Sequence, residues 1–412
     1  MVCYPTDSHS YLYEQDCQGL AWKEHCFECK IFASLPPNAI LPNTIRLLLR
    51  PFLQHHRKPA PYDGWNDFLS LQSHAEDFQS LQSKNADGLT TWQTVELMAQ
   101  ALLKYSAVKE SAQYVQGMLA RVMTNAHTLV TPTLDPLGLC LDPLTALLNH
   151  SCVPNAHITF DGRALSLRSL REIAADEEIT ISYVDTTNPT SARRNELSSR
   201  YFFTCQCPAC RSGLTNGQPE MTISLPIQRL VNDAIVLQHQ AAALSPLEAS
   251  KKLEEAMSLL QRDEFPPSHQ PYASLLHSTF LSALAAQDWA RALKYATLTT
   301  RDVEPIQYPL PWHPIRLVRK WVLLRLLVHI ATLDAENDET VKVLKKLNIN
   351  HVLVSQGLWK ELRNEVAKSH GDDTRFAREI QTFGEEIGAV ASSIRDRELE
   401  LEWAKVARAA DL

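Results

Sequence analysis

Cysteine is missing from nearly half of the 412-residue chain, because all nine cysteines lie at or before Cys210. This uneven distribution indicates a metal-bearing front half and a helical back half. Long apolar runs are missing too. The most apolar stretch, Trp321 to Ile330, is interrupted by Arg325 and His329 and is too short to cross a bilayer, so we expect no membrane partner. A basic excess is also lacking, since the formal net charge is -7, and we therefore expect no direct binding to nucleic acids.

Two further absences bear on location and on ligand binding. The first residues lack a basic region followed by an apolar segment, so we expect no signal peptide and a place in the nucleus and/or the cytoplasm. In those reducing compartments clustered cysteines are better read as metal ligands than as disulfide partners. No two of the twelve glycines are two positions apart, so the chain contains no Gly-x-Gly turn. Nothing in the sequence indicates an oligomer, and we expect a monomer.

The hydrophobic pattern predicts an α+β protein. From about 40 to 130 it is mostly helical, because apolar side chains recur on one face of the stretches Thr91–Ala107 and Tyr114–Ala126. Between about 155 and 185 the period changes to two. There, Asp161-Gly162 forms a predicted hairpin turn between alternating strands, and residues 177–183 form a third candidate strand.

The second half of the chain reads differently. Pro, Gly and Ser cluster at 208–226, which is the best candidate for a domain boundary. Beyond it the pattern is almost entirely helical, and residues 272–302 are similar to a tetratricopeptide-like helical hairpin. We therefore expect an antiparallel helical array. Such an array either covers the flank of its neighbour or offers a concave surface for a protein substrate.

A C-x-C-x2-C cluster is the strongest local signal for metal binding. Cys205, Cys207 and Cys210 lie close enough in sequence to share one tetrahedral Zn²⁺, which prefers four soft ligands in a structural site. A fourth ligand must come from elsewhere, and Cys152 is the natural candidate. The alternative is three unrelated cysteines in a loop. That reading is less favoured, because free thiols at such density are prone to oxidation.

Three motifs follow one another in a recognisable order. The run Asn149–Asn155 reads NHSCVPN, residues 178–183 read EITISY, and the run Tyr201–Cys210 ends in the cysteine cluster. In order and spacing they resemble a SET domain of the SET-and-MYND type of protein-lysine methyltransferase. The resemblance extends to 137–150 and to the arginine-containing stretch 189–201.

The resemblance implies a domain organisation and a fold. The fold is a partial SET β-fold with a helical insert and a zinc-binding post-SET segment, followed by an all-α, tetratricopeptide-like domain. The boundaries we predict are 1–30 for a remnant of a MYND-type zinc module, 31–135 for the helical SET insert, 136–185 for the core SET region, 186–212 for the post-SET zinc segment and 213–412 for the helical C-terminal domain.

The resemblance also implies an activity: transfer of a methyl group from S-adenosylmethionine to a lysine of a histone or non-histone protein. In that reading Tyr183 orients the lysine amine and Tyr201 lines its channel. Asn149 and His150 contact the cofactor, and Phe203 packs on the adenine. Taken singly, both tyrosines are more often core aromatics with a satisfied hydroxyl, and the Asn-His pair more often caps a preceding apolar stretch.

Two features depart from the family pattern and keep a second hypothesis open. Cys17, His25 and Cys29 resemble only the last part of a MYND module, so the chain reads as N-terminally truncated relative to the family. The Gly-x-Gly turn that lets the backbone approach the cofactor is missing as well. The alternative to the enzyme is therefore a catalytically inactive SET-like interaction protein. A general zinc-binding transcription factor fits less well, because the chain is acidic.

Overall fold

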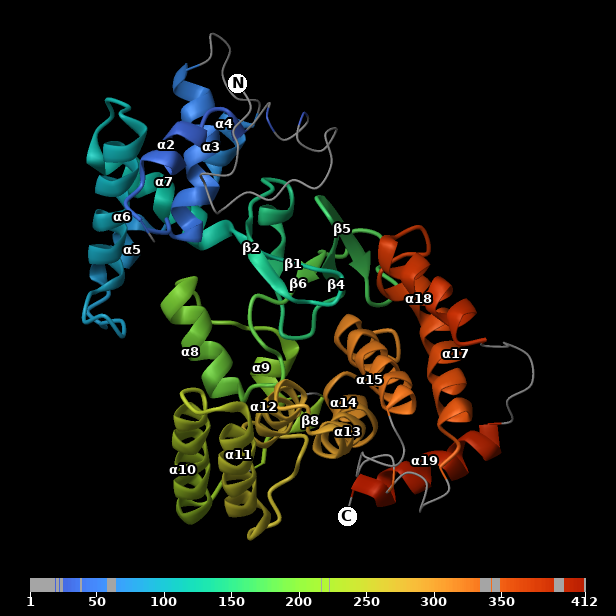
Figure 1. Ribbon diagram of the computed structural model, residues 1–412. Coiled ribbons are helices and arrows are strands. Elements are labelled where there is room, and N and C mark those ends of the chain that lie inside the picture. Colours follow the sequence, from blue (N-terminus) through green and yellow to red (C-terminus); the bar gives the residue numbers. More distant parts are fainter. Residues whose placement is uncertain are drawn as a thin grey trace. The chain divides into compact units, whose positions relative to one another are not determined.

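The computed structural model describes residues 25–37, 39–57, 64–215, 217–221, 223–333, 349–388 and 396–410, together with Gly19, Trp22 and Lys342. Cys17 therefore lies outside the described residues. The chain divides into two compact units: the first takes in the described residues of 1–130, 136–149 and 195–204, and the second takes in those of 131–135, 150–194 and 205–412. Helices and small two-stranded sheets occur together, which confirms the predicted α+β class (Figure 1).

The first unit is mainly helical, as the pattern from 40 to 130 predicts. Its helices are α2 (Cys29–Ser34), α3 (Asn43–Arg57), α4 (Trp65–Ser70), α5 (Ala75–Ser80), α6 (Thr91–Ser106) and α7 (Ala112–Asn125). A capping box between Thr90 and Gln93 fixes the start of α6, and the Ser111 hydroxyl caps α7. Phe52 and Leu102 are fully buried in the shared core of these helices.

A short hairpin completes the first unit. Strand β1 (His127–Val130) pairs antiparallel with β2 (Pro136–Cys140), and the 3-10 turn η1 (Thr145–Leu147) follows. Three leucines of this segment are strongly exposed, with relative exposures of 64% for Leu137, 76% for Leu144 and 67% for Leu147. Leu137 lies on the hairpin, and Leu144 and Leu147 lie at the two ends of the turn that follows it.

The β-rich part of the second unit contains the predicted hairpin. Strand β4 (Ala156–Asp161) pairs with β5 (Ala164–Ser169), and Gly162 adopts a φ of +61° in the turn between them. The third strand, β6, is shorter than predicted and covers only Thr180–Ile181, opposite β3 (Asn149–His150). The reason is local: the Asn155 side chain bonds the carbonyl of residue 178 and the amide of residue 180, and so replaces part of a strand ladder.

Helices make up the rest of the second unit. They are α8 (Thr190–Arg200), whose last residues belong to the first unit, α9 (Pro208–Ser212), α10 (Leu225–Ala241), α11 (Pro246–Gln261), α12 (Tyr272–Ala285), α13 (Trp289–Leu298), a π-helical turn (Thr299–Val303), α14 (Glu304–Gln307), α15 (Pro314–Thr332), α17 (His351–Ser369), α18 (Arg375–Glu386) and α19 (Asp396–Ala410). Two very short strands, β7 (Leu214–Thr215) and β8 (Gln218–Pro219), lie between α9 and α10.

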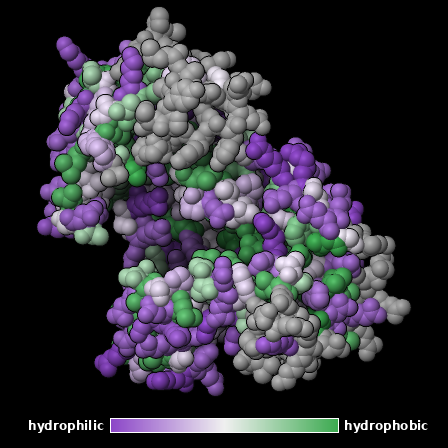
Figure 2. Space-filling model, in the orientation of Figure 1, coloured by the Kyte–Doolittle hydropathy of each residue, from purple (hydrophilic) through white to green (hydrophobic). Residues whose placement is uncertain are grey.

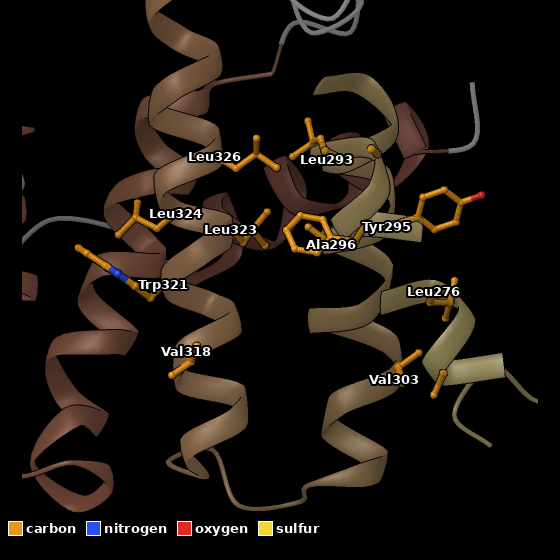
Figure 3. Close-up of a cluster of buried hydrophobic side chains, with 14 of the residues drawn as sticks. Leu276, Leu293, Tyr295, Ala296, Val303, Val318, Trp321, Leu323, Leu324 and Leu326 are labelled. Atoms are coloured by element: carbon orange, nitrogen blue, oxygen red, sulfur yellow. The ribbon is translucent and has the colours of Figure 1, made fainter. Parts of the chain in front are cut away.

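Helix α15 lies at the centre of the helical core and is buried on most of its circumference. Figure 3 shows Leu323 and Leu326 pointing toward Ala296 and Leu293 of α13, while Trp321 points to the opposite side. There the indole makes edge contacts with aromatic rings of α18. None of the described helices is long and apolar enough to cross a membrane. Over α10 and α11, Figure 2 shows mainly hydrophilic residues on the outer face.

The β4–β5 hairpin is held against the end of α17 and the start of α18. Arg168 donates to the Ala367 carbonyl at 2.6 Å, at the end of α17 where the helix dipole favours a cation. At the start of α18, the carboxylate of Asp161 accepts the amide of Arg375 at 3.2 Å. A cation at the end of one helix and a carboxylate at the start of the next thus hold the hairpin and these helices in one compact unit.

Candidate metal centre and active site

In the second unit Cys152 lies beside three cysteines that come more than fifty residues later in the sequence. The sulfur atoms of Cys152, Cys205, Cys207 and Cys210 all lie within 4.8 Å of one another, and those of Cys152 and Cys210 are 3.5 Å apart. Four thiolates at about 2.3 Å from one tetrahedral Zn²⁺ would be separated by about 3.8 Å. The four predicted ligands therefore have the spacing that a structural zinc site requires.

The thiols of this cluster differ in acidity. Burial raises the pKa of Cys152 above its usual range, and it raises the pKa of Cys205 to about 11. Burial acts on Cys207 in the same direction. There it is outweighed by hydrogen bonds from the backbone amides of Cys210 and Cys152 and from neighbouring thiols, which lower the Cys207 pKa to about 7. Cys207 therefore supplies a thiolate at neutral pH more readily than Cys152 or Cys205.

His150 joins the cluster to the strand that leads to Tyr183. Its Nδ1 accepts the backbone N–H of Tyr183 at 3.0 Å, and its Nε2 lies 3.2 Å from the sulfur of Cys152. The His150 and Tyr183 rings are in tilted contact, with their centroids 5.3 Å apart. Burial, helped by the charge of Arg193, lowers the pKa of His150 to about 4, so the imidazole is neutral at physiological pH.

Two consecutive arginines of α8 connect the chain segments around the cluster. Arg193 is only 1% exposed, and its guanidinium donates to Thr190, to Thr215 and to the Leu214 carbonyl at 3.0, 3.1 and 2.8 Å. Arg194 donates to the carbonyl of Cys210 at 2.8 Å. Sequence reasoning noted arginines in this stretch without assigning them a role. Two adjacent arginines on a helix that precedes a cysteine cluster are a signal that could have been used.

The remaining predicted site residues fall in the first unit. Asn149 is exposed and Phe203 is half-buried. The Tyr201 amide continues the helix by bonding the Leu197 carbonyl at 2.9 Å, and burial raises the pKa of the Tyr201 hydroxyl. The structure thus brings together Cys152, the three clustered cysteines, His150 and Tyr183, while Asn149, Tyr201 and Phe203 are described within the other unit.

Phe202, which lies between Tyr201 and Phe203, was not predicted from the sequence to have a role. Phe202 has a φ of +59°, a left-handed conformation that bulky residues rarely adopt. Its ring packs against His74 and Phe78, with centroid distances of 5.1 and 4.8 Å. No local sequence signal marks this conformation, since glycine or asparagine would be expected at such a φ.

Of the N-terminal cysteines, Cys26 and Cys29 lie in the described part of the chain. Among the residues that the structure describes, the four-cysteine set is the only group of three or more potential ligands with atoms this close. His25 lies 3.3 Å from a carboxylate oxygen of Glu28, and Arg50 donates to the same oxygen at 2.6 Å. Cys29 is buried at the start of α2.

The motif order, the hairpin and the cysteine cluster define a SET-domain protein. In agreement, the sequence model of the SET domain family matches residues 30–184. The chain is 37% identical over 204 residues to the SET domain and MYND-type zinc finger protein 6 of Schizosaccharomyces pombe, a match that covers 50% of the chain and 39% of that relative. It is 28% identical over 328 residues to the histone-lysine N-methyltransferase SMYD3 of Mus musculus, which covers 76% of the chain and 72% of the relative.

A further relative extends the match toward the C-terminus. The N-lysine methyltransferase SMYD2 of Mus musculus is 24% identical over 353 residues, which is 82% of the chain and 78% of that protein. The chain thus spans about two fifths of the length of the fission yeast relative and about three quarters of the length of the two mouse relatives. On these findings the chain is similar to the SET-and-MYND family of protein-lysine methyltransferases, and its SET domain match covers residues 30–184.

Proposed function

We propose that this chain transfers a methyl group from S-adenosylmethionine to lysine side chains of histone or non-histone proteins. The observation that carries the proposal is the fixed position of Tyr183, whose backbone amide is bonded to His150 at 3.0 Å beside the four-cysteine cluster. The printed names of the mouse relatives, a histone-lysine and an N-lysine methyltransferase, support the same reaction class. The proposal includes a monomeric protein that acts in the nucleus and/or the cytoplasm.

The chemistry asks little of the protein beyond deprotonation and alignment. A lysine amine has an ordinary pKa of about 10.4 and attacks only when it is neutral. An apolar channel disfavours the ammonium form, and the hydroxyl of Tyr183 accepts a hydrogen bond that orients the neutral amine. Tyr201, which is half-buried, lines that channel. Alignment of the amine with the methyl group then supplies most of the rate acceleration.

The residues present fit both groups that the family implies. S-adenosylmethionine supplies the methyl group; Asn149, which is exposed, and His150 and Phe203, which are half-buried, would hold it. Zinc would be held by the four cysteines, whose number, burial and spacing suit a closed structural site. No Gly-x-Gly turn is present to bring the backbone close to the cofactor, so the side chains of Asn149 and Phe203 would carry more of the binding.

A second candidate function is a non-catalytic interaction protein. The missing Gly-x-Gly turn favours it, and so do the three exposed leucines Leu137, Leu144 and Leu147, since exposed apolar patches often mark protein contacts. Of these observations, the missing turn bears directly on whether the cofactor binds.

Titration calorimetry of S-adenosylmethionine into the 412-residue chain separates the two candidates. The proposal expects saturable binding that Asn149→Ala abolishes. It further expects transfer of a labelled methyl group to a lysine-containing substrate, with a loss of at least about tenfold in Tyr183→Phe, because the aligning hydroxyl is removed. A folded wild-type chain that binds no S-adenosylmethionine would rule out the enzyme and leave the interaction protein.

A further inference from the structure

Both nitrogens of the His150 imidazole are engaged by the protein. Nδ1 accepts the Tyr183 amide at 3.0 Å, and a neutral imidazole whose Nδ1 is an acceptor carries its proton on Nε2. That Nε2–H lies 3.2 Å from the sulfur of Cys152, within the range of a hydrogen bond to sulfur. The imidazole thus has a defined tautomer and a donor aimed at a predicted metal ligand.

This arrangement changes the role that the family resemblance suggests for the side chain. Contact with a cofactor through the imidazole would compete with one of two existing hydrogen bonds. A donor to a metal-bound thiolate has a recognised effect: it orients the ligand and tunes its basicity. Because the same ring fixes the Tyr183 amide, a change at the metal is transmitted to Tyr183 through one rigid group.

We infer that His150 is a positioning residue whose imidazole couples the four-cysteine metal centre to the strand that carries Tyr183. This inference rests on the proposed function for its catalytic meaning. Its structural part depends only on the two contacts of the ring. Linkage requires the coupling to be reciprocal: if metal binding favours the cofactor-binding geometry, bound S-adenosylmethionine must raise the affinity for the metal, and we expect this to be seen as slower release.

Two polar substitutions separate the two halves of the coupling. The amide of asparagine reaches about as far as Nδ1, and that of glutamine about as far as Nε2. His150→Asn therefore keeps an acceptor for Tyr183 and loses the donor to Cys152. His150→Gln keeps the donor and loses the acceptor, and His150→Leu loses both. A matched control is His370→Leu, a buried histidine in the same unit that bonds the Pro132 carbonyl and is remote in sequence from the cluster.

The experiment measures three properties of the full chain. They are the rate of zinc release to a chromogenic chelator with and without S-adenosylmethionine, the affinity for S-adenosylmethionine by calorimetry, and the thiolate-to-metal absorption of the cobalt-substituted protein. We expect zinc release to quicken by about tenfold in the Leu and Asn variants and to stay within about threefold of wild type in the Gln variant. Affinity should fall in the Leu and Gln variants. The slowing of release by S-adenosylmethionine should disappear in all three.

The cobalt absorption provides the readout that a general loss of stability would not change. It should shift in the Leu and Asn variants, because the donor to Cys152 is gone, and it should match wild type in the Gln and His370→Leu proteins. Identical spectra in all variants, or the same pattern of change for Asn and Gln, would overturn the inference. If His150→Leu does not fold, the Asn and Gln pair decides. Should wild type bind zinc but no S-adenosylmethionine, the proposed function fails while the spectra still test the contact with Cys152.

Discussion

The neighbourhood of the cysteine cluster and the helical core around α15 are stabilised by different means. Around the cluster, segments near residues 150, 183, 193 and 205–215 meet through single polar atoms, such as the 2.8 Å contact of Arg194 with the Cys210 carbonyl. Around α15, dozens of apolar side chains share the burial, and Leu323 is one of many with almost no exposure. The stability of the first region depends on the positions of single polar atoms. The stability of the second depends on how completely apolar side chains fill the core.

The two regions should therefore respond differently to conservative substitutions. A polar site has few substitutes for each atom, because a buried group that loses its partner bears the full cost of desolvation. An apolar core tolerates exchanges that conserve volume, since contacts are redistributed among many neighbours. A substitution of one atom can therefore be severe in one region and mild in the other.

The largest effect is expected for Cys207→Ser, which replaces one sulfur by oxygen. The variant should lose its zinc, and residues 201–215 should become sensitive to protease, because a structural site contributes about 10 kcal/mol or more through its metal. Metal content by mass spectrometry and limited proteolysis measure the outcome. Cys140→Ser, a half-buried cysteine outside the cluster, is the control and should keep its metal. A Cys207→Ser protein with one zinc per chain and unchanged protease resistance would contradict the comparison.

The two regions also differ in how far the sequence predicts them. The four clustered cysteines and the Asp161-Gly162 turn follow from motif and period, since their residue types have few other uses at that spacing. The link from His150 to Cys152 and Tyr183 and the left-handed Phe202 do not follow, because they depend on side-chain directions that tertiary packing decides. In the helical half the periodicity predicts helices, and it leaves their partners open. The roles of Asn149, Tyr201 and Phe203 stay predictions.

The next largest effect is expected for a substitution at Gly384. It tests whether the helical core contains positions that tolerate substitution as poorly as the cysteine cluster does. A Cβ added at Gly384 would lie 2.1 Å from the Trp359 ring, which is held by its hydrogen bond to the Ile380 carbonyl at 2.8 Å. Gly384→Ala should therefore lower the free energy of unfolding by about 3 kcal/mol through overpacking. Gly117→Ala, on a helix with space at that position, should be neutral or stabilising by up to about 1 kcal/mol. Equal denaturant midpoints for the two variants would refute this account.

A third, smaller effect concerns a charge buried in the helical core. Burial raises the pKa of the Glu304 carboxyl to about 7, although Arg319 opposes the shift, whereas an unfolded glutamate titrates near about 4.3. The folded state thus keeps a proton that the unfolded state releases. The stability contributed by protonated Glu304 is full below the unfolded pKa, and it is lost as the pH rises toward 7.

Glu304→Gln should flatten this pH dependence. Between pH 5 and pH 7 the free energy of unfolding of the wild type should fall by about 2 kcal/mol more than that of the variant. Guanidinium denaturation at several pH values measures it. Glu248→Gln is the matched control. Hydrogen bonds from Ser245 lower the pKa of this exposed carboxyl, so its titration falls below that pH window and the slope should stay as in wild type. If the stability of the Glu304→Gln protein still falls between pH 5 and pH 7 as in wild type, a group other than Glu304 causes the pH dependence.

The smallest effect is expected where the change is as conservative as that at Cys207 but lies in the apolar core. Leu323 of α15 has no measurable exposure, and Figure 3 shows it between α15 and α13. Methionine has a similar volume and can follow the same space, so Leu323→Met should cost less than about 1.5 kcal/mol in unfolding free energy. Leu323→Ala opens a cavity and should cost about 2–5 kcal/mol. If Leu323→Met proved as costly as Leu323→Ala, the shape of the side chain as well as its volume would determine stability in the core. The two regions would then be equally intolerant of conservative change and would differ only in polarity.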